Sequence, residues 1–165
     1  MPGEPIAQFE TLYRAHGSAL LAYLSRRFGR CASPEDLLQE TFVHAMRRPS
    51  QVAGAQSPRA FLFGIARHLG LSALRRRQRL VIDQPVENLD IAAPIPAADA
   101  RLAELRQAIE RLPDPLRATL ELRLHDELSY EEISVVLKVP VGTVRSRLHN
   151  ALRKLQEQFA QEDPR

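Results

Sequence analysis

The stretch SYEEISVVLKVPVGTVRSRLHNALRKL, residues 129–155, decides the fold. Ser129 followed three residues later by Glu132 has the spacing of a capping box, which predicts that a helix begins here. After a short turn around Pro140, a second helix is predicted over Thr143–Gln158, and its first half is basic. Two short helices joined by a tight turn, the second of them basic, are typical of a helix-turn-helix.

Projected at about 100° per residue, the last helix has one apolar stripe and one polar face. The stripe is formed by Val144, Leu148, Ala151, Leu152 and Leu155. The polar face and its flanks carry Thr143, Ser146, Arg147, His149, Asn150 and Arg153. Arg and Asn can hydrogen-bond guanine and adenine edges in the major groove, whereas Ser, Thr and His can contact phosphates. Taken alone, the projection fits an ordinary amphipathic helix with a solvated basic face equally well.

The remaining helices upstream are predicted from periodicity and from their start signals. Apolar residues recur at three- and four-residue spacing in the first of them. Ser33-Pro34 and Ser57-Pro58 mark two starts, because Ser is a favoured N-cap and Pro suits the first helical position. Residues 49–57 are expected to be a loop. The predicted helices are 6–27, 33–48, 58–79, 101–111, 114–125 and 129–138, followed by the last helix.

The inward faces of two of these helices follow from the same projection. Residues predicted to pack inward are Leu38, Phe42 and Ala45 in the second helix and Phe61, Leu62, Ile65, Ala66 and Leu69 in the third. Residues 80–100 lack helical periodicity and contain three prolines, so we expect an extended linker there. The predicted fold class is all-α: two small helical domains joined by that linker, the C-terminal one a helix-turn-helix.

Composition and charge restrict the classes of function that the chain can have. The 165 residues carry a formal net charge of +3, and basic residues gather before the linker and again in 138–154, which has no acid. Two separated basic patches indicate a polyanionic partner, although basic runs are often only solvated surface. No apolar stretch is long enough to cross a membrane and no leader is evident, so we expect a cytoplasmic protein without membrane insertion.

Features of an enzyme are missing from the sequence. No nucleophile has a base partner, no glycine-rich phosphate loop is present, and the five histidines have no ligand spacing. The single cysteine, Cys31, can form neither an internal disulfide nor a multi-cysteine zinc site. The sequence therefore predicts a protein that is not an enzyme, with no cofactor, no metal and no small-molecule substrate.

The C-terminal motifs resemble a known family. The runs Leu128–Ile133 (LSYEEI) and Pro140–His149 (PVGTVRSRLH), preceded by LPDPLR at 112–117, closely resemble the C-terminal domain of extracytoplasmic-function (ECF) sigma factors of bacterial RNA polymerase. This resemblance implies that the last helix reads the −35 promoter element and that the domain contacts the β flap of the polymerase. The implied DNA-binding residues are Thr143, Arg145, Ser146, Arg147, His149, Asn150 and Arg153.

The N-terminal half carries an independent match to the same family. The run Asp36–Val43 (DLLQETFV) resembles the sigma segment that grips the clamp helices of the polymerase β′ subunit. The residues implied in that contact are Asp36, Gln39, Glu40, Val43 and Arg47. The residues alone leave a solvated helix face as the simpler alternative.

The third predicted helix resembles the sigma segment that binds and opens the −10 promoter element. The DNA-binding residues that this implies are Arg67, His68, Arg75, Arg76, Arg77 and Arg79. The loop before this helix captures an unpaired base in the family, which makes 49–57 a candidate for that contact. For the arginine run, a solvated helix end that favours the helix dipole is the alternative.

The chain departs from the family pattern at a few positions. His68 and Ser72 stand where Asn and Asp are common, and Asn150 replaces a frequent Arg. Leu152 also replaces a frequent Arg, and we expect it to be structural because it continues the apolar stripe. Lys138 stands where the turn usually has Gly, so we expect that turn to be made without glycine's freedom at positive φ.

The resemblance therefore implies an ECF sigma factor. Residues 1–79 would dock on polymerase and open the −10 element, 80–100 would be the linker, and 101–165 would recognise the −35 element. RNA polymerase core and promoter DNA are the implied partners, and an anti-sigma factor is a candidate partner because the family commonly uses one. The alternatives are a free-standing helix-turn-helix regulator that acts without polymerase core and a helical adaptor that binds only proteins.

Overall fold

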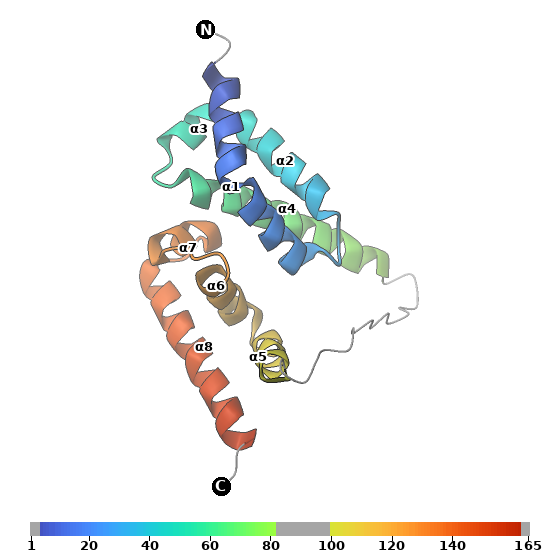
Figure 1. The fold of residues 1–165 in the computed structure, drawn as a ribbon, viewed down its shortest axis with the longest axis vertical. Helices are drawn as coiled ribbons and strands as arrows, with labels where there is room; N and C mark the ends of the chain where they lie inside the picture. The colour runs from blue at the N-terminus through green and yellow to red at the C-terminus, as the bar shows by residue number, and fades with distance from the viewer. Residues whose placement is uncertain (1–3, 82–99, 163–165) are drawn as a thin grey trace. The chain divides into compact units, whose positions relative to one another are not determined.

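The computed structural model describes residues 4–81 and 100–162 (Figure 1). Within these ranges the secondary structure is helical, with no strand, so the predicted all-α class is confirmed. Positions 82–99 of the predicted linker lie outside the described residues. The helices are α1 (Glu4–Phe28), α2 (Pro34–Met46), α3 (Pro49–Gly54), α4 (Pro58–Val81), α5 (Ala100–Glu110), α6 (Asp114–Leu124), α7 (Tyr130–Leu137) and α8 (Val141–Glu162).

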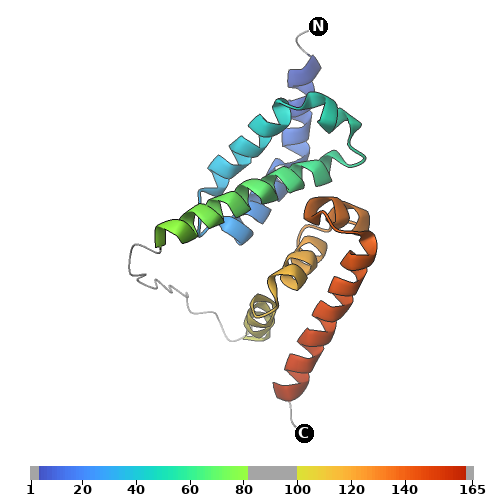
Figure 2. The same ribbon diagram turned by 180° about the vertical axis from the view of Figure 1, so that it is seen from behind.

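The chain divides into two compact units, one that holds α1–α4 and one that holds α5, α6, α8 and the first residues of α7, Tyr130–Ile133. In the first unit α1, α2 and α4 all pack against one another, as the front and back views show (Figures 1 and 2). The shared core holds fully buried Leu20, Leu24, Phe28 and Phe63. The ring of Tyr23 lies 5.2 Å from that of Phe63, which ties α1 to α4.

Serine caps fix where α2 and α4 begin, as the sequence predicts. The backbone N–H of Asp36 donates to Ser33 Oγ at 3.3 Å, and that of Ala60 donates to Ser57 Oγ at 3.1 Å. Each bond satisfies an N–H that the first turn of a helix leaves without an intrahelical partner. The predicted inward face of α2 is also confirmed, because Leu38, Phe42 and Ala45 are all buried.

Two expectations for the first unit are wrong. Residues 49–57 are not all loop, because Pro49–Gly54 form the short helix α3. Pro49 starts α3 with its fixed φ, and the buried side chain of Val52 holds it to the unit. In α4, Leu62, Ala66 and Leu69 are buried as expected, but Phe61 and Ile65 are only half-buried.

In the second unit α6 packs along α8, and α5 touches α8 as well. The apolar stripe of α8 is buried at Val144, Leu148, Ala151 and Leu155. Leu152 is the exception: its side chain is 52% exposed, so the expectation that it continues the buried stripe is wrong. It lies at the edge of the stripe, and neither α5 nor α6 covers it.

The capping box that opens α7 is present in full. The backbone N–H of Glu132 donates to Ser129 Oγ at 3.1 Å, and the backbone N–H of Ser129 donates to Glu132 Oε2 at 2.9 Å. The helix ends at Leu137, and Lys138 then takes a φ of 54°. The turn therefore does use positive φ, but a lysine adopts it in place of the glycine usual at this position. Helix α8 begins at Val141, slightly earlier than predicted.

Candidate functional site

The polar face of α8 is held outward by the burial of the opposite stripe. Arg145, Ser146, His149 and Arg153 are exposed. Thr143, Arg147 and Asn150 are half-buried at the edges of the face. All the residues predicted to contact DNA from this helix therefore lie on its accessible side or at its margins.

The start of α8 is fixed by backbone hydrogen bonds at the turn. The N–H groups of Thr143 and Val144 both donate to the Pro140 carbonyl, at 2.9 and 3.1 Å. Ser146 Oγ donates to the carbonyl of Thr143 at 3.0 Å, so this hydroxyl has a partner in the helix. Arg153 lies 3.9 Å from Glu157, which partly offsets its charge. Arg145, Arg147 and His149 are the side chains best placed for an external partner.

Arg123 of α6 braces the turn that leads into α7, a role that the sequence does not predict. Its guanidinium donates to the Leu128 carbonyl at 3.0 Å and lies 5.4 Å from the centroid of the Tyr130 ring. Glu127 in the same turn has a φ of 52°, which is unusual for a side-chain-bearing residue. Leu128 is fully buried, so these contacts and its burial together hold the residues just before α7 in place.

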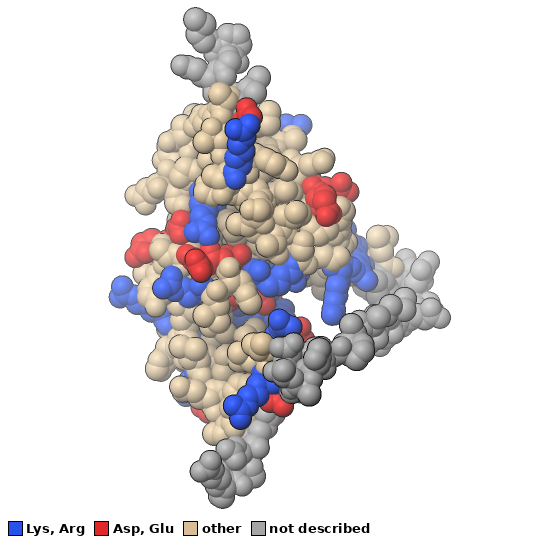
Figure 3. All heavy atoms as spheres, in the orientation of Figure 1, with Lys and Arg blue, Asp and Glu red and all other residues tan. Residues whose placement is uncertain are grey.

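The predicted polymerase-binding residues share the outward face of α2. Asp36, Gln39, Glu40 and Arg47 are exposed, and Val43 is 43% exposed although it is apolar. Acidic side chains lie over the first turns of this helix (Figure 3). Glu40 lies 3.8 Å from His44, and the two form an ion pair only when the histidine is protonated. The structure therefore brings these five residues together on one accessible surface.

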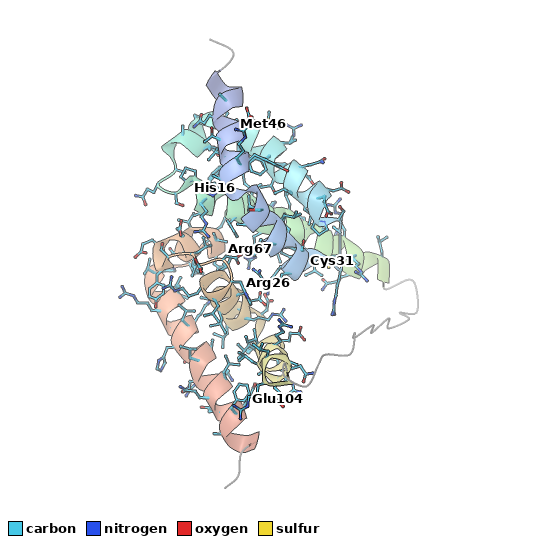
Figure 4. All side chains as sticks on the ribbon, in the orientation of Figure 1. His16, Arg26, Cys31, Met46, Arg67 and Glu104 are labelled. Atoms are coloured by element: carbon cyan, nitrogen blue, oxygen red, sulfur yellow. The ribbon has the colours of Figure 1, made fainter. Side chains whose placement is uncertain are left out.

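Two exposed apolar residues beside that face are missing from the sequence-based prediction. Met46 is 50% exposed and follows Val43 by one turn (Figure 4), and Tyr13 of α1 is also 50% exposed. The Tyr13 ring lies 4.9 Å from that of Phe42, so α1 contributes to the same surface. The signal available in the sequence is the position of Met46 at i+3 from Val43.

The predicted DNA-binding residues of α4 lie along its second half. His68 and the arginines of the run, Arg75, Arg76, Arg77 and Arg79, are exposed, while Arg67 is half-buried. The helix contains no acidic residue anywhere between Pro58 and Val81. These side chains do not share one face, because consecutive arginines point about 100° apart around the helix.

The comparisons with known proteins agree in both halves of the chain. Residues 12–80 match the family described as sigma-70 region 2, and residues 102–155 match sigma-70 region 4. The RNA polymerase sigma factor YlaC of Bacillus subtilis is 31% identical over 90% of this chain and 90% of its own length. The chain belongs to the ECF sigma factors of the sigma-70 family.

Other relatives support the assignment of this chain to the ECF sigma factors. The ECF RNA polymerase sigma factor SigE of Mycolicibacterium smegmatis is 34% identical over 92% of this chain, which spans 62% of SigE. Sigma factor RpoE of Bartonella quintana, solved with the anti-sigma factor NepR, has a TM-score of 0.69 and 26% identity over 93% of this chain and 97% of its own. CnrH, solved with the cytosolic domain of CnrY, has a TM-score of 0.57 and 27% identity over 94% and 89%.

Membership of this family assigns the sigma factor to the initiation of transcription. Sigma factors are transcription initiation factors that bind DNA together with RNA polymerase. The region 2 match covers α2 and α4 almost in full, and the region 4 match covers α6, α7 and the polar face of α8. Among the described residues, no helix is both long and apolar enough to cross a membrane.

Proposed function

We propose that this sigma factor directs RNA polymerase core to specific promoters and assists their opening. The α2 face formed by Asp36, Gln39, Glu40, Val43 and Arg47 docks on the β′ clamp helices. Helix α4, with the segment before it, contacts the −10 element through Arg67, His68, Arg75, Arg76, Arg77 and Arg79. The polar face of α8 reads the −35 element from Thr143 to Arg153, and the same unit contacts the β flap.

The observation that carries this proposal is the arrangement of polar faces opposite buried cores on α2 and α8. The buried residues Leu38 and Phe42 fix the outward direction of the α2 face, and Val144 and Leu148 do the same for α8. A surface held rigidly by its own core loses little conformational entropy when it binds. The two faces also differ in charge, acidic on α2 and basic on α8, as expected for a protein partner and a DNA partner.

The proposed roles divide the chain into three segments. Residues 1–79 dock on polymerase and contact the −10 element, 80–100 form the linker, and 101–165 recognise the −35 element. The polymerase performs the chemistry, so the sigma factor itself acts without catalysis in the cytoplasm. RpoE is solved with an anti-sigma factor and CnrH with the cytosolic domain of CnrY, which supports an anti-sigma factor as a partner of this chain.

In vitro transcription with purified core polymerase on a promoter library tests the proposal. We expect a distinct set of promoters to be transcribed only when the sigma factor is added, with a shared −10 and −35 sequence among them. The double variant Asp36→Ala, Gln39→Ala tests the docking face: it should fold but give much less transcript from the same promoters. Tight binding of a specific duplex by the protein alone, with no effect of core polymerase, would instead identify a free-standing regulator.

A further inference from the structure

Lys138, in the turn between α7 and α8, has a backbone conformation that its side chain makes costly. Its φ of 54° lies in the left-handed region, which glycine adopts readily and other residues rarely do. The turn therefore holds a lysine where a glycine would fold with less strain. Residues in such strained conformations cluster at functional sites, so a role for the lysine side chain outside the fold needs to be considered.

The side chain of Lys138 has no polar partner in the turn. The residue is exposed, and within the described parts of the chain its ammonium forms neither a hydrogen bond nor an ion pair. Backbone groups close the turn, because the N–H groups of Thr143 and Val144 both donate to the Pro140 carbonyl. The charge of Lys138 is therefore available to a partner outside the chain.

The charge around Lys138 favours an anionic partner. No Asp or Glu occurs in 138–154, which includes the turn and the first half of α8. Arg145 follows within the first turns of that helix and is exposed. With no carboxylate in this stretch, the two cations attract an anion and repel a basic surface.

The position of Lys138 in the helix-turn-helix indicates which anion. The second helix of this motif enters the major groove by its N-terminal residues, while the first helix crosses the sugar–phosphate backbone. Lys138 directly follows Leu137, the last residue of α7, and precedes Val141, the first residue of α8, by at most about 11 Å of chain. It therefore lies between the helix that crosses the backbone and the helix that enters the groove.

We propose that Lys138 binds a backbone phosphate of the −35 DNA, beside the base-reading face of α8. Phosphate contacts position a protein on the duplex without reading its sequence, and a lysine makes such a contact as a compact charge on a flexible stem. The contact accounts for a side chain that strains the turn and has no polar partner in it. The inference rests on the proposed function and adds the turn to the DNA surface of α8.

The experiment measures promoter binding by reconstituted holoenzymes as a function of salt concentration. Lys138→Gly should lower the magnitude of the slope of log K against log salt by about 0.9, the value for one phosphate that is no longer neutralised. The preference of this variant among −35 sequences should stay the same. Lys138→Arg keeps the charge and should retain the wild-type slope.

The matched control is Glu127→Gly. Glu127 is also exposed and has a φ of 52°, in the turn before α7. Both glycine variants remove a strained side chain, but only Lys138→Gly removes a cation. Both should therefore increase the hydrogen-exchange protection of α7, whereas only Lys138→Gly should weaken promoter binding.

The remaining outcomes would each contradict a different part of the argument. An unchanged salt slope in Lys138→Gly would overturn the phosphate contact. Lower affinity of this variant for core polymerase without DNA would also overturn it, because the lysine would then contact an acidic protein surface. If the wild-type holoenzyme showed no promoter-specific binding, the proposed function itself would fail, which is a distinct result.

Discussion

Lys138 adopts a backbone conformation that L-residues normally avoid. Its φ of 54° lies in the left-handed region, where the Cβ approaches the following carbonyl at a cost of about 1–2 kcal/mol. Glycine takes this conformation freely but loses more entropy on folding, roughly 0.4–1 kcal/mol. The first cost is the larger, so the lysine turn is less stable than a glycine turn would be.

The substitution Lys138→Gly should therefore raise the free energy of unfolding of the two helices that the turn joins, α7 and α8, by about 0.5–1 kcal/mol. Hydrogen exchange of the α7 and α8 amides measures this change. The control is Lys154→Gly, at an exposed helical position of α8, where glycine should lower stability by about 1 kcal/mol. A loss of stability in Lys138→Gly would show that the lysine side chain contributes more than the strained backbone costs.

Arg147 is the half-buried arginine at the edge of the α8 polar face. If it donates two hydrogen bonds to a guanine, Arg147→Ala should weaken promoter binding by about 1–3 kcal/mol and relax the preference at one base pair of the −35 element. Selection from a randomised promoter pool with holoenzyme measures both effects. An equal loss on every sequence would make Arg147 a phosphate contact instead.

The sequence predicts individual residues best where the signal is local. Ser129 and Glu132 are three residues apart, and both of their predicted hydrogen bonds are present. The prediction for Leu152 is wrong because a helical projection gives the direction of a side chain but not whether a neighbouring helix covers it. The brace formed by Arg123 is also absent from the prediction, because it depends on the path of the turn that contains Glu127.

At the scale of elements, the sequence predicts helix starts with a serine cap to within a residue or two. Helix α3 is absent from the prediction because its six residues are too few to give a helical period. The close contact between α1 and α4 also cannot be predicted, since nothing in the local sequence indicates which residue faces Gly70. That contact is a property of tertiary packing.

The contact between α1 and α4 gives a prediction about stability. Gly70→Ala should destabilise the first unit by about 1–3 kcal/mol, because the added methyl group overlaps the buried Phe28 ring. Gly64 on the same helix provides the control, since nothing lies within 4 Å of its Cβ position. Gly64→Ala should stabilise α4 by up to about 1 kcal/mol. Amide hydrogen exchange in α1 and α4 measures both; equal effects would contradict the close contact.

The exposed face of α2 gives a prediction about binding. Gln39→Ala with Glu40→Ala should weaken the affinity for core polymerase and leave the fold intact, because neither side chain packs in the core. Titration of labelled sigma factor with core polymerase measures the affinity, and circular dichroism measures the fold. The matched pair Gln8→Ala with Glu10→Ala, also exposed but on α1, should bind normally. Unchanged affinity of the α2 variant would remove this face from the interface.

At the scale of the whole molecule, the distribution of charge follows the division into two units. The second half of α4 and the first half of α8 are both basic, and each belongs to a different unit. The sequence predicts this separation because the linker residues 80–100 interrupt the helical pattern between two independent sets of motifs. The two proposed DNA contacts, on separate units, can contribute different properties to one promoter complex.

The two units should therefore respond differently to the removal of arginine side chains. Replacing Arg75, Arg76 and Arg77 with Gln should lower the magnitude of the salt slope of promoter binding by up to about 2.7, at roughly 0.9 for each phosphate, without changing sequence preference. Arg147→Ala should do the reverse: it should change the preference at one base pair and alter the slope little. Salt titrations of both holoenzymes on matched and mismatched promoters separate these effects. A change of both the salt slope and the sequence preference in each variant would contradict this prediction. The two units would then not make separate contacts, and phosphate binding and base recognition would belong to one continuous surface.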